Sequence, residues 1–277
     1  MAADITWTGA GDGTSWSQAA NWNPQVVPGE GDDVIITLPG TYTVVLNATV
    51  SVNSIMLGGE SGTQTLRKSS GTLTLAAASR IGPNGVLEML AGYITGDGVL
   101  TNEGSIVADA PSWTGINNST LINEGELVHE RGIFYIASSA LFENRGLYRI
   151  AGDLNISESG AMGTLLNTGT LEKTSGEGIA AIGVLVDSRP ESHIRSSSGT
   201  LRLDATSTYH DMTFHVATAP SGIIFNYGTH TFRGTISGEP VGRVTVNTSI
   251  RAHESGGTLN FTGTGLQWIS SYLIEGG

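Results

Sequence analysis

The chain has 277 residues, a formal net charge of −12 and 39 glycines, and it contains no cysteine. The negative charge repels nucleic acids and anionic membrane surfaces, and the lack of cysteine excludes disulfides and thiolate metal sites. No apolar run reaches the roughly 18 residues of a membrane-spanning helix, so we expect neither nucleic-acid binding nor membrane insertion.

The segment 1–57 does not repeat, and it holds three of the five tryptophans, Trp7, Trp16 and Trp22. Residues 34–37 then form a short, mostly apolar run and Tyr42, Val44 and Leu46 share one face by alternation, which predicts two strands. An aromatic, turn-rich segment ahead of a repeat array is typical of a cap, because the end of such an array exposes unpaired backbone groups. We therefore predict a cap and first strands over residues 1–57 and stacked coils over residues 58–277.

This segment resembles a known module. Residues 7–22 read W-x-G-x-G-D-G-x-x-W-x-x-x-x-N-W, followed by P-G-x-x-D-D-V-x-I and G-T-Y-T-V-x-L. The pattern is similar to the N-terminal module of large secreted bacterial β-helix proteins, the haemagglutinin-like and autotransporter-passenger-like surface adhesins. The resemblance implies a right-handed parallel β-helix that is exported, often as one part of a long adhesin or filament, and it implies no defined catalytic residue. The opening Met-Ala-Ala-Asp would suit a mature secreted protein or a fragment.

A repeat between residues 100 and 171 supports the same fold. Four glycines are each preceded at two positions by asparagine, with an apolar residue four positions before and another two positions after. The units are Leu100-Asn102-Gly104-Ile106, Leu121-Asn123-Gly125-Leu127, Phe142-Asn144-Gly146-Tyr148 and Leu165-Asn167-Gly169-Leu171. A period of about 21 residues leaves no room for a helix and predicts an all-β, single-stranded parallel β-helix, or β-solenoid. We expect the apolar residues to point inward and the asparagines to stack inside or at a bend.

Beyond Gly169 the next glycines of this series are Gly199, Gly228 and Gly257, so the spacing lengthens to about 30 residues. This change predicts coils of about 21 residues up to position 171 and coils with longer loops after it, eight to ten coils in all. Loops inserted on one side of a solenoid often carry its function. Residues 174–256 are thus the predicted binding region.

Two sets of polar residues suggest ligand sites. Hard oxygens from Asp12, Glu30, Asp32 and Asp33 lie near tight turns and would suit calcium, the one cofactor that the sequence suggests; the alternative is ordinary turn chemistry. In the 174–256 region, Arg195, His210 and His230 are the predicted ligand contacts. His230 stands two positions after a glycine, where other units have an inward apolar residue, so it must be paired if it is buried.

No convergent catalytic group emerges from the sequence. Hydrolysis of a glycan needs two carboxylates on one face, and a lyase needs a base beside a neutralised uronate, but the acidic residues share no common coil position. We expect a non-enzymatic structural or adhesive module of a secreted or cell-surface bacterial protein. Its partner would be a surface glycan, a protein or another copy bound end to end. The alternative is a polysaccharide lyase, a glycoside hydrolase or a carbohydrate-binding module on the same scaffold.

Overall fold

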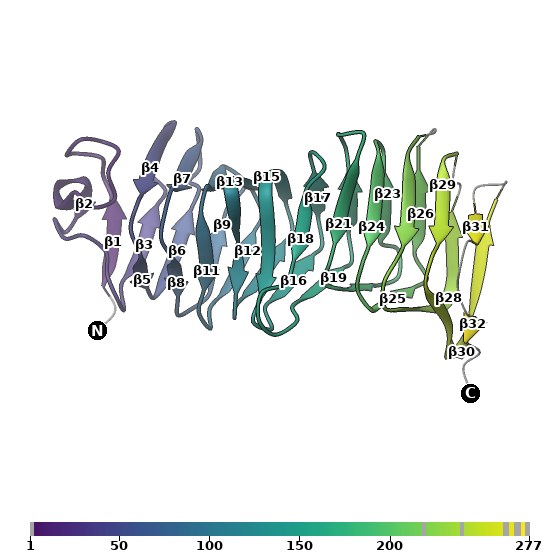
Figure 1. Ribbon diagram of the computed structural model, residues 1–277. Helices are drawn as coiled ribbons and strands as arrows, with labels where there is room; N and C mark the ends of the chain where they lie inside the picture. Colours follow the sequence, from purple (N-terminus) through teal and green to yellow (C-terminus); the bar gives the residue numbers. More distant parts are fainter. Residues whose placement is uncertain (1–2, 218–219, 239–240, 263–265, 269–272, 275–277) are drawn as a thin grey trace.

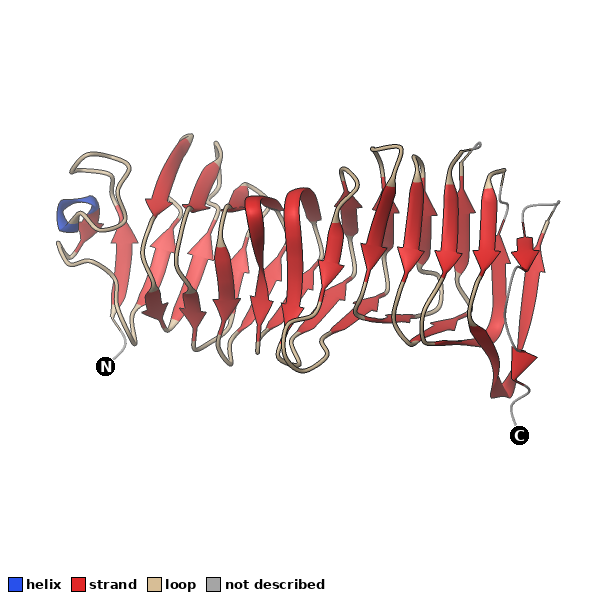
Figure 2. Cartoon of the chain, viewed as in Figure 1, coloured by secondary structure: helices blue, strands red, loops and turns tan. Residues whose placement is uncertain are grey.

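A computed structural model describes residues 3–217, 220–238, 241–262, 266–268 and 273–274. Within them the chain winds into a parallel β-solenoid of about 11 coils, an elongated stack with the two termini at opposite ends (Figure 1). The helical part of these residues is one 3-10 turn, η1 (Ala19–Asn21), blue in Figure 2. No helix in the described ranges is long and apolar enough to cross a membrane. The predicted all-β solenoid is confirmed.

Each coil contributes one strand to each of three parallel faces, which we call faces 1, 2 and 3. Face 1 consists of β1 (Asp4–Trp7), β3 (Asp33–Ile36), β6 (Ser54–Leu57), β9 (Ser79–Ile81), β12 (Val99–Asn102), β14 (Thr120–Asn123), β16 (Leu141–Asn144), β19 (Thr164–Asn167), β22 (Leu185–Ser188), β25 (Ser207–His210), the first parts of β28 (Thr229–Gly238) and β30 (Ser249–Phe261), and β32 (Leu273–Ile274). Face 2 consists of β4 (Tyr42–Leu46), β7 (Gln64–Lys68), β10 (Gly85–Met89), the first parts of β13 (Ser105–Asn117) and β15 (Glu126–Ala137), β17 (Leu147–Ile150), β20 (Thr170–Lys173), β23 (His193–Ser196), β26 (Thr213–Val216) and the second parts of β28 and β30. Face 3 consists of β5 (Val50–Val52), β8 (Leu73–Leu75), β11 (Gly92–Thr95), the second parts of β13 and β15, β18 (Asn155–Ser157), β21 (Ile179–Ile182), β24 (Thr200–Leu203), β27 (Gly222–Phe225), β29 (Arg243–Val246) and β31 (Leu266–Trp268).

The core runs down the middle of the stack. Successive side chains of a strand point alternately into the solenoid and out of it. Every second residue therefore points inward and packs on the equivalent residues of the coils before and after. Leu121, Leu127 and Phe142 are fully buried, as the repeat predicts. Leu121 pairs with Phe142, one coil further along face 1. No coil could bury its apolar row alone, so the stacking itself creates the core.

An aromatic cluster closes the N-terminal end, as predicted. Trp7, Trp16 and Trp22 are buried, and the ring of Trp22 lies edge-on to both others at centroid distances of 4.9 Å. Its indole Nε1 donates to the backbone oxygen of Trp16 at 2.7 Å. The short strand β2 (Trp22–Asn23) pairs antiparallel with one edge of β1. The other edge of β1 pairs in parallel with β3, the next strand of face 1.

The later coils are no longer than the earlier ones, so the predicted lengthening after residue 171 is wrong. Face 1 pairs Leu165 with Val186, Tyr209 with Phe232, and His230 with Ile250. The sequence separation of each pair is close to the period of the early repeat. The stack has about 11 coils instead of the predicted eight to ten. The number is higher because the coils stay short and because the first complete coil already spans residues 33–52.

Candidate functional site

A row of four asparagines follows the inner edge of face 1 and joins four coils. Asn102, Asn123, Asn144 and Asn167 are fully buried, and each pairs in register with the next. The Nδ2 atoms of the first three donate to the Oδ1 of the following asparagine, at 2.7, 2.9 and 2.9 Å. All four Nδ2 atoms also donate to a backbone oxygen of the next coil. With their donors spent inside the protein, these amides hold coils together, and the expectation that they stack inside is confirmed.

The chain's two lysines are also interior residues. Lys68 and Lys173 are fully buried at the end of face 2, at the coil position that His129 occupies between them. Each binds the backbone oxygen three residues further on, where the chain turns toward face 3: Lys68 Nζ to Gly71 at 2.6 Å, His129 Nε2 to Gly132 at 3.0 Å, and Lys173 Nζ to Gly176 at 2.7 Å. These polar side chains satisfy turn carbonyls that would otherwise be buried without a donor.

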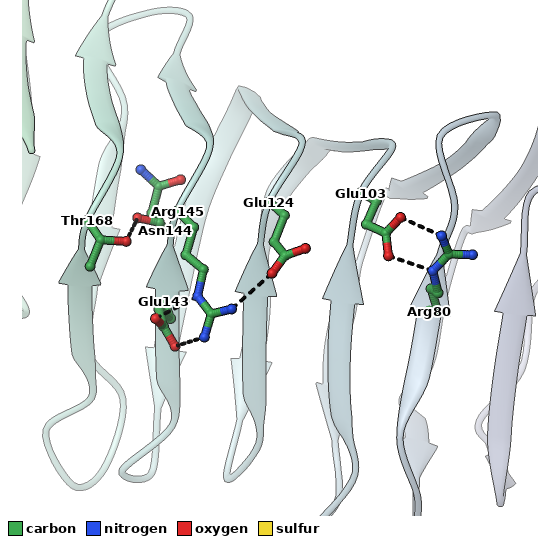
Figure 3. Close-up of polar contacts among 7 residues, drawn as sticks. All are labelled: Arg80, Glu103, Glu124, Glu143, Asn144, Arg145 and Thr168. Atoms are coloured by element: carbon green, nitrogen blue, oxygen red, sulfur yellow. Dashed lines mark hydrogen bonds and ion pairs between the residues drawn. The ribbon is translucent and has the colours of Figure 1, made fainter.

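Charged residues on the outside link neighbouring coils at the turn from face 1 to face 2 (Figure 3). Arg80 forms a two-point ion pair with Glu103 of the next coil, its Nε lying 2.6 Å from Oε1. Arg145 reaches back one coil to Glu124 at 2.9 Å and also binds Glu143 at 2.7 Å. Exposed ion pairs contribute at most about 1 kcal/mol each, so this row adds to coil pairing without dominating it.

The acidic residues predicted to bind calcium serve other contacts. Asp12 accepts hydrogen bonds from the Ser15 hydroxyl at 2.6 Å and from Asn21 Nδ2 at 2.7 Å. The pKa of Asp12 is held well below its usual range by these two hydrogen bonds and by two more from the backbone N–H groups of Ser15 and Thr14. The Ser15 hydroxyl has the largest effect. Asn21 in turn accepts from the backbone of Gly11 at 2.9 Å and of Gly13 at 3.0 Å. The G-D-G sequence and the asparagine of the N-terminal motif therefore build one loop.

The remaining predicted calcium ligands lie on and beside β3. Asp33 Oδ1 accepts from Asn53 Nδ2 at 2.7 Å and from the Ser54 hydroxyl at 2.5 Å, and Asp32 Oδ2 accepts from the backbone of Gly29 at 2.9 Å. Glu30 is an exposed residue of the turn ahead of β3. Within the described ranges no three His, Asp or Glu residues gather closely enough to hold a metal ion.

The three predicted ligand contacts of the C-terminal half lie apart. His230 is fully buried, as expected for an inward histidine, but on face 1. Its Nδ1 lies 3.1 Å from the Tyr209 hydroxyl and its Nε2 3.0 Å from the backbone oxygen of Tyr227. Burial lowers the pKa of His230 to about 4. His210 ends a face 1 strand and pairs with Asp211 at 2.9 Å, whereas Arg195 belongs to face 2.

Arg195 has other titratable neighbours on face 2. It pairs in register with Glu172 of the preceding coil and with His215 of the following one. The Arg195 Nε atom is buried and has no hydrogen-bond partner among the described residues. His193, two positions earlier, lies with its Nδ1 3.3 Å from Nε2 of His215. Burial, and secondly the charge of Arg195, lower the pKa of His193.

Face 3 carries a surface feature that the sequence analysis did not single out, a cluster of Tyr93, Trp113 and Tyr135. The indole of Trp113 lies 4.7 Å from the Tyr93 ring and 5.9 Å from the Tyr135 ring, centroid to centroid. Trp113 keeps 36% of its surface exposed. The signal was present in the sequence, since Tyr93 and Tyr135 are separated by twice the interval of the asparagine repeat. Comparison of the chain with protein-family models, curated proteins and solved structures finds no match.

Proposed function

We propose that this chain is a non-enzymatic structural and adhesive module of an exported bacterial surface or filament protein. The observation that carries the proposal is the parallel pairing that continues from coil to coil on three faces through about 11 coils. At about 4.8 Å per coil, such a stack is about 50 Å long. Its backbone hydrogen bonds run along the axis and its inward polar side chains bind neighbouring coils, so it forms a stiff spacer.

The proposed mechanism has two parts: the length of the solenoid and the contact of its surface with a partner. A stiff spacer holds a binding face away from the cell, while the outward residues of that face contact a surface glycan or a protein. The resemblance of residues 7–46 to the N-terminal module of secreted β-helix adhesins supports export, and the acidic, cysteine-free composition is compatible with it. Repetition of coils also permits end-to-end association with another copy.

One observation favours the alternative of a polysaccharide lyase. Glu172, Arg195 and His215 lie in register on adjacent coils of face 2. In a lyase a cationic side chain neutralises a uronate, and a nearby base removes a carbon-bound proton. Arg195 and a histidine of that face would fill these two roles.

The two functions are separated by a turnover assay. The purified chain is incubated with uronate-containing and neutral polysaccharides, with and without calcium, while reducing ends and the absorbance of unsaturated uronate products are followed. We expect saturable binding without turnover. Turnover that disappears in the Arg195→Ala variant but persists in a Thr101→Ala control, on another face, would overturn the proposal in favour of the lyase.

A further inference from the structure

We propose that Tyr93, Trp113 and Tyr135 form a platform on face 3 that binds the sugar rings of a neutral, β-linked polysaccharide. This inference deepens the adhesive function proposed above and rests on it. It names the binding face and the chemical class of the ligand.

The platform is built around a glycine. Tyr93, Gly115 and Tyr135 are paired in register on three successive coils, with the buried Ile94, Ile116 and Ile136 directly after them. Since alternate residues point to opposite sides, the two tyrosines and the glycine all face outward. Backbones two coils apart lie about 9.6 Å from each other, yet the two tyrosine rings are 6.5 Å apart, centroid to centroid. Both rings therefore lean toward each other. Gly115 permits the close approach of the two backbones, because a Cβ at this position would lie 2.1 Å from the backbone oxygen of Tyr135.

Trp113 completes the platform from the same strand as Gly115. It faces outward two residues earlier and contacts both tyrosine rings. Gly115 itself is buried, and the atoms nearest to its Cβ position are backbone atoms of Tyr135. The result is a cluster of three tilted rings: the plane of Trp113 makes an angle of 43° with that of Tyr93 and 70° with that of Tyr135, so the cluster offers both ring faces and ring edges to a ligand.

A bulge precedes Trp113 and distinguishes this coil from the next. Face 2 and face 3 pair Asp109 with Arg131 and Trp113 with Ile133. Three residues therefore separate these pairs in β13, but one separates them in β15. The pairs Ala108–His129 and Asp109–Arg131 just before them give β15 one additional residue, so β13 is longer by one residue net, in the exposed Pro111-Ser112 segment. Bulges of this kind re-aim a neighbouring side chain and are frequent beside functional sites.

Cross-strand stabilisation alone does not account for this arrangement. An aromatic pair on a sheet contributes about 0.2 to 1 kcal/mol, and it needs neither a bulge nor a half-exposed tryptophan. The cluster alone is too small for a stable protein interface, which covers about 800 Å² of each surface, because three aromatic side chains supply at most about 250 Å² each when completely buried and these are already partly covered by one another.

The chemistry of the cluster selects a neutral sugar. The rings are uncharged, and the ion pair of Asp109 with Arg131, on the strands that carry Trp113 and Tyr135, is balanced and offers hydrogen bonds to hydroxyl groups. The net charge of −12 disfavours an anionic polymer. The apolar C–H face of an equatorially substituted pyranose matches an aromatic ring, and a β-linked chain is extended enough to bring successive sugars over rings on neighbouring coils.

The test is isothermal titration calorimetry on the full chain with cellohexaose, with its α-linked counterpart maltohexaose, and with an anionic hexagalacturonate. We expect cellohexaose to bind most tightly, with a dissociation constant between about 0.1 and 1 mM. Trp113→Ala should weaken this binding at least tenfold. Tyr227→Ala, which removes an exposed aromatic ring outside the cluster (65% exposed), is the matched control and should leave the constant within twofold.

Circular dichroism checks the fold of each variant, and Tyr135→Leu, which keeps an apolar contact but removes a ring, serves if Trp113→Ala misfolds. Unchanged binding in the folded variant, no binding to cellohexaose, or equal or tighter binding of either comparison sugar would each overturn the inference. The adhesive function fails by a different result, which is turnover of a polysaccharide.

Discussion

Replacing Asn144 tests the claim that the asparagine row holds the coils together. The Asn144 side chain donates to Asn167 Oδ1 and to the backbone oxygen of Thr170, both at 2.9 Å, and accepts from Asn123 Nδ2 at 2.9 Å. Alanine removes all three hydrogen bonds. Asn123 Nδ2 keeps a second acceptor, the backbone oxygen of Leu147 at 3.1 Å, but Asn167 Oδ1 loses its donor in the row.

The expected cost follows from these contacts. A buried hydrogen bond contributes about 1 kcal/mol net, and an acceptor left unpaired costs about 1 to 3 kcal/mol more. Asn144→Ala should therefore reduce the free energy of unfolding by about 4 kcal/mol. Asn144→Asp should cost more at neutral pH, because a carboxylate would face two acceptors without a proton to share. Burial raises the pKa of such a carboxyl, so its deficit should shrink as the pH falls and the group gains a proton.

The measurement combines urea unfolding with hydrogen exchange, since coils of a solenoid can open locally. Asn144→Ala should lose amide protection in strands β14, β16 and β19 before the ends of the stack do. The control is Thr168→Ala, at the neighbouring turn of Figure 3, which removes one long hydrogen bond to the Asn144 backbone (3.3 Å) and should cost less than about 1 kcal/mol. If Asn144→Ala stays within about 1 kcal/mol of the unaltered protein, the reasoning about the row is wrong.

The remaining predictions concern other interior residues. Leu127→Ala should cost about 2 to 5 kcal/mol in urea unfolding, and an unchanged midpoint would contradict its core position. Tyr148→Phe should not destabilise the protein, because the buried Tyr148 hydroxyl has no hydrogen-bond partner in the described part of the chain; a loss above about 1 kcal/mol would show that it has one. Burial lowers the pKa of Lys68 from 10.5 to about 8, so the unfolded chain binds more protons between these values. Stability relative to Lys68→Met should therefore rise from pH 8 to 10.5, and parallel pH profiles would refute this. Burial likewise lowers the pKa of His129 and of His230 from 6.5 to about 4. Stability should fall on acidification through that window, by less in a double glutamine variant, and an equal fall in both proteins would speak against it.

The repeat from residue 100 to 171 could be predicted because its glycines all lie at one kind of turn. Asn102-Glu103-Gly104 and its three equivalents lead from face 1 to face 2, so their spacing equals the coil length. Inward positions such as Leu121 then follow from strand alternation alone. The cap could be located for a similar reason, since clustered tryptophans and glycines are incompatible with a regular coil.

The same reasoning fails after Gly169 because a coil has three turns. Gly199 lies between faces 2 and 3, Gly228 between faces 3 and 1, and Gly257 between faces 1 and 2. Distances between them therefore add part of a coil to a whole one. The asparagine row also ends there, since Asn167 pairs with Ser188. His230 was thus expected on face 2, beside residues such as Leu127, but it lies on face 1.

The candidate surfaces depend on which residues of neighbouring coils are paired, and this register cannot be read from the sequence. The face 3 cluster becomes visible when Trp113 is placed two residues before Gly115 on a coil lengthened by a bulge. Likewise Arg195 was grouped with His210 as a ligand contact, but its actual neighbours Glu172 and His215 are set by coil pairing. The spacing of repeated residues in the sequence gives the coil length, but the hydrogen-bonded pairing of the strands decides which residues one coil apart lie side by side.

The asparagine row also bears on how a gene for such a chain can change. Asn123 and Asn144 occupy equivalent places, and each is followed by one residue and a glycine. Deleting residues 124–144 would place Asn123 directly before Arg145-Gly146 and align it with Asn167, in the relation that Asn144 has now. Tandem duplication or loss of one such unit would therefore lengthen or shorten the rod by one step of about 4.8 Å while every inward row stayed aligned. Length in such a protein can evolve in whole coils, independently of the surfaces at either end.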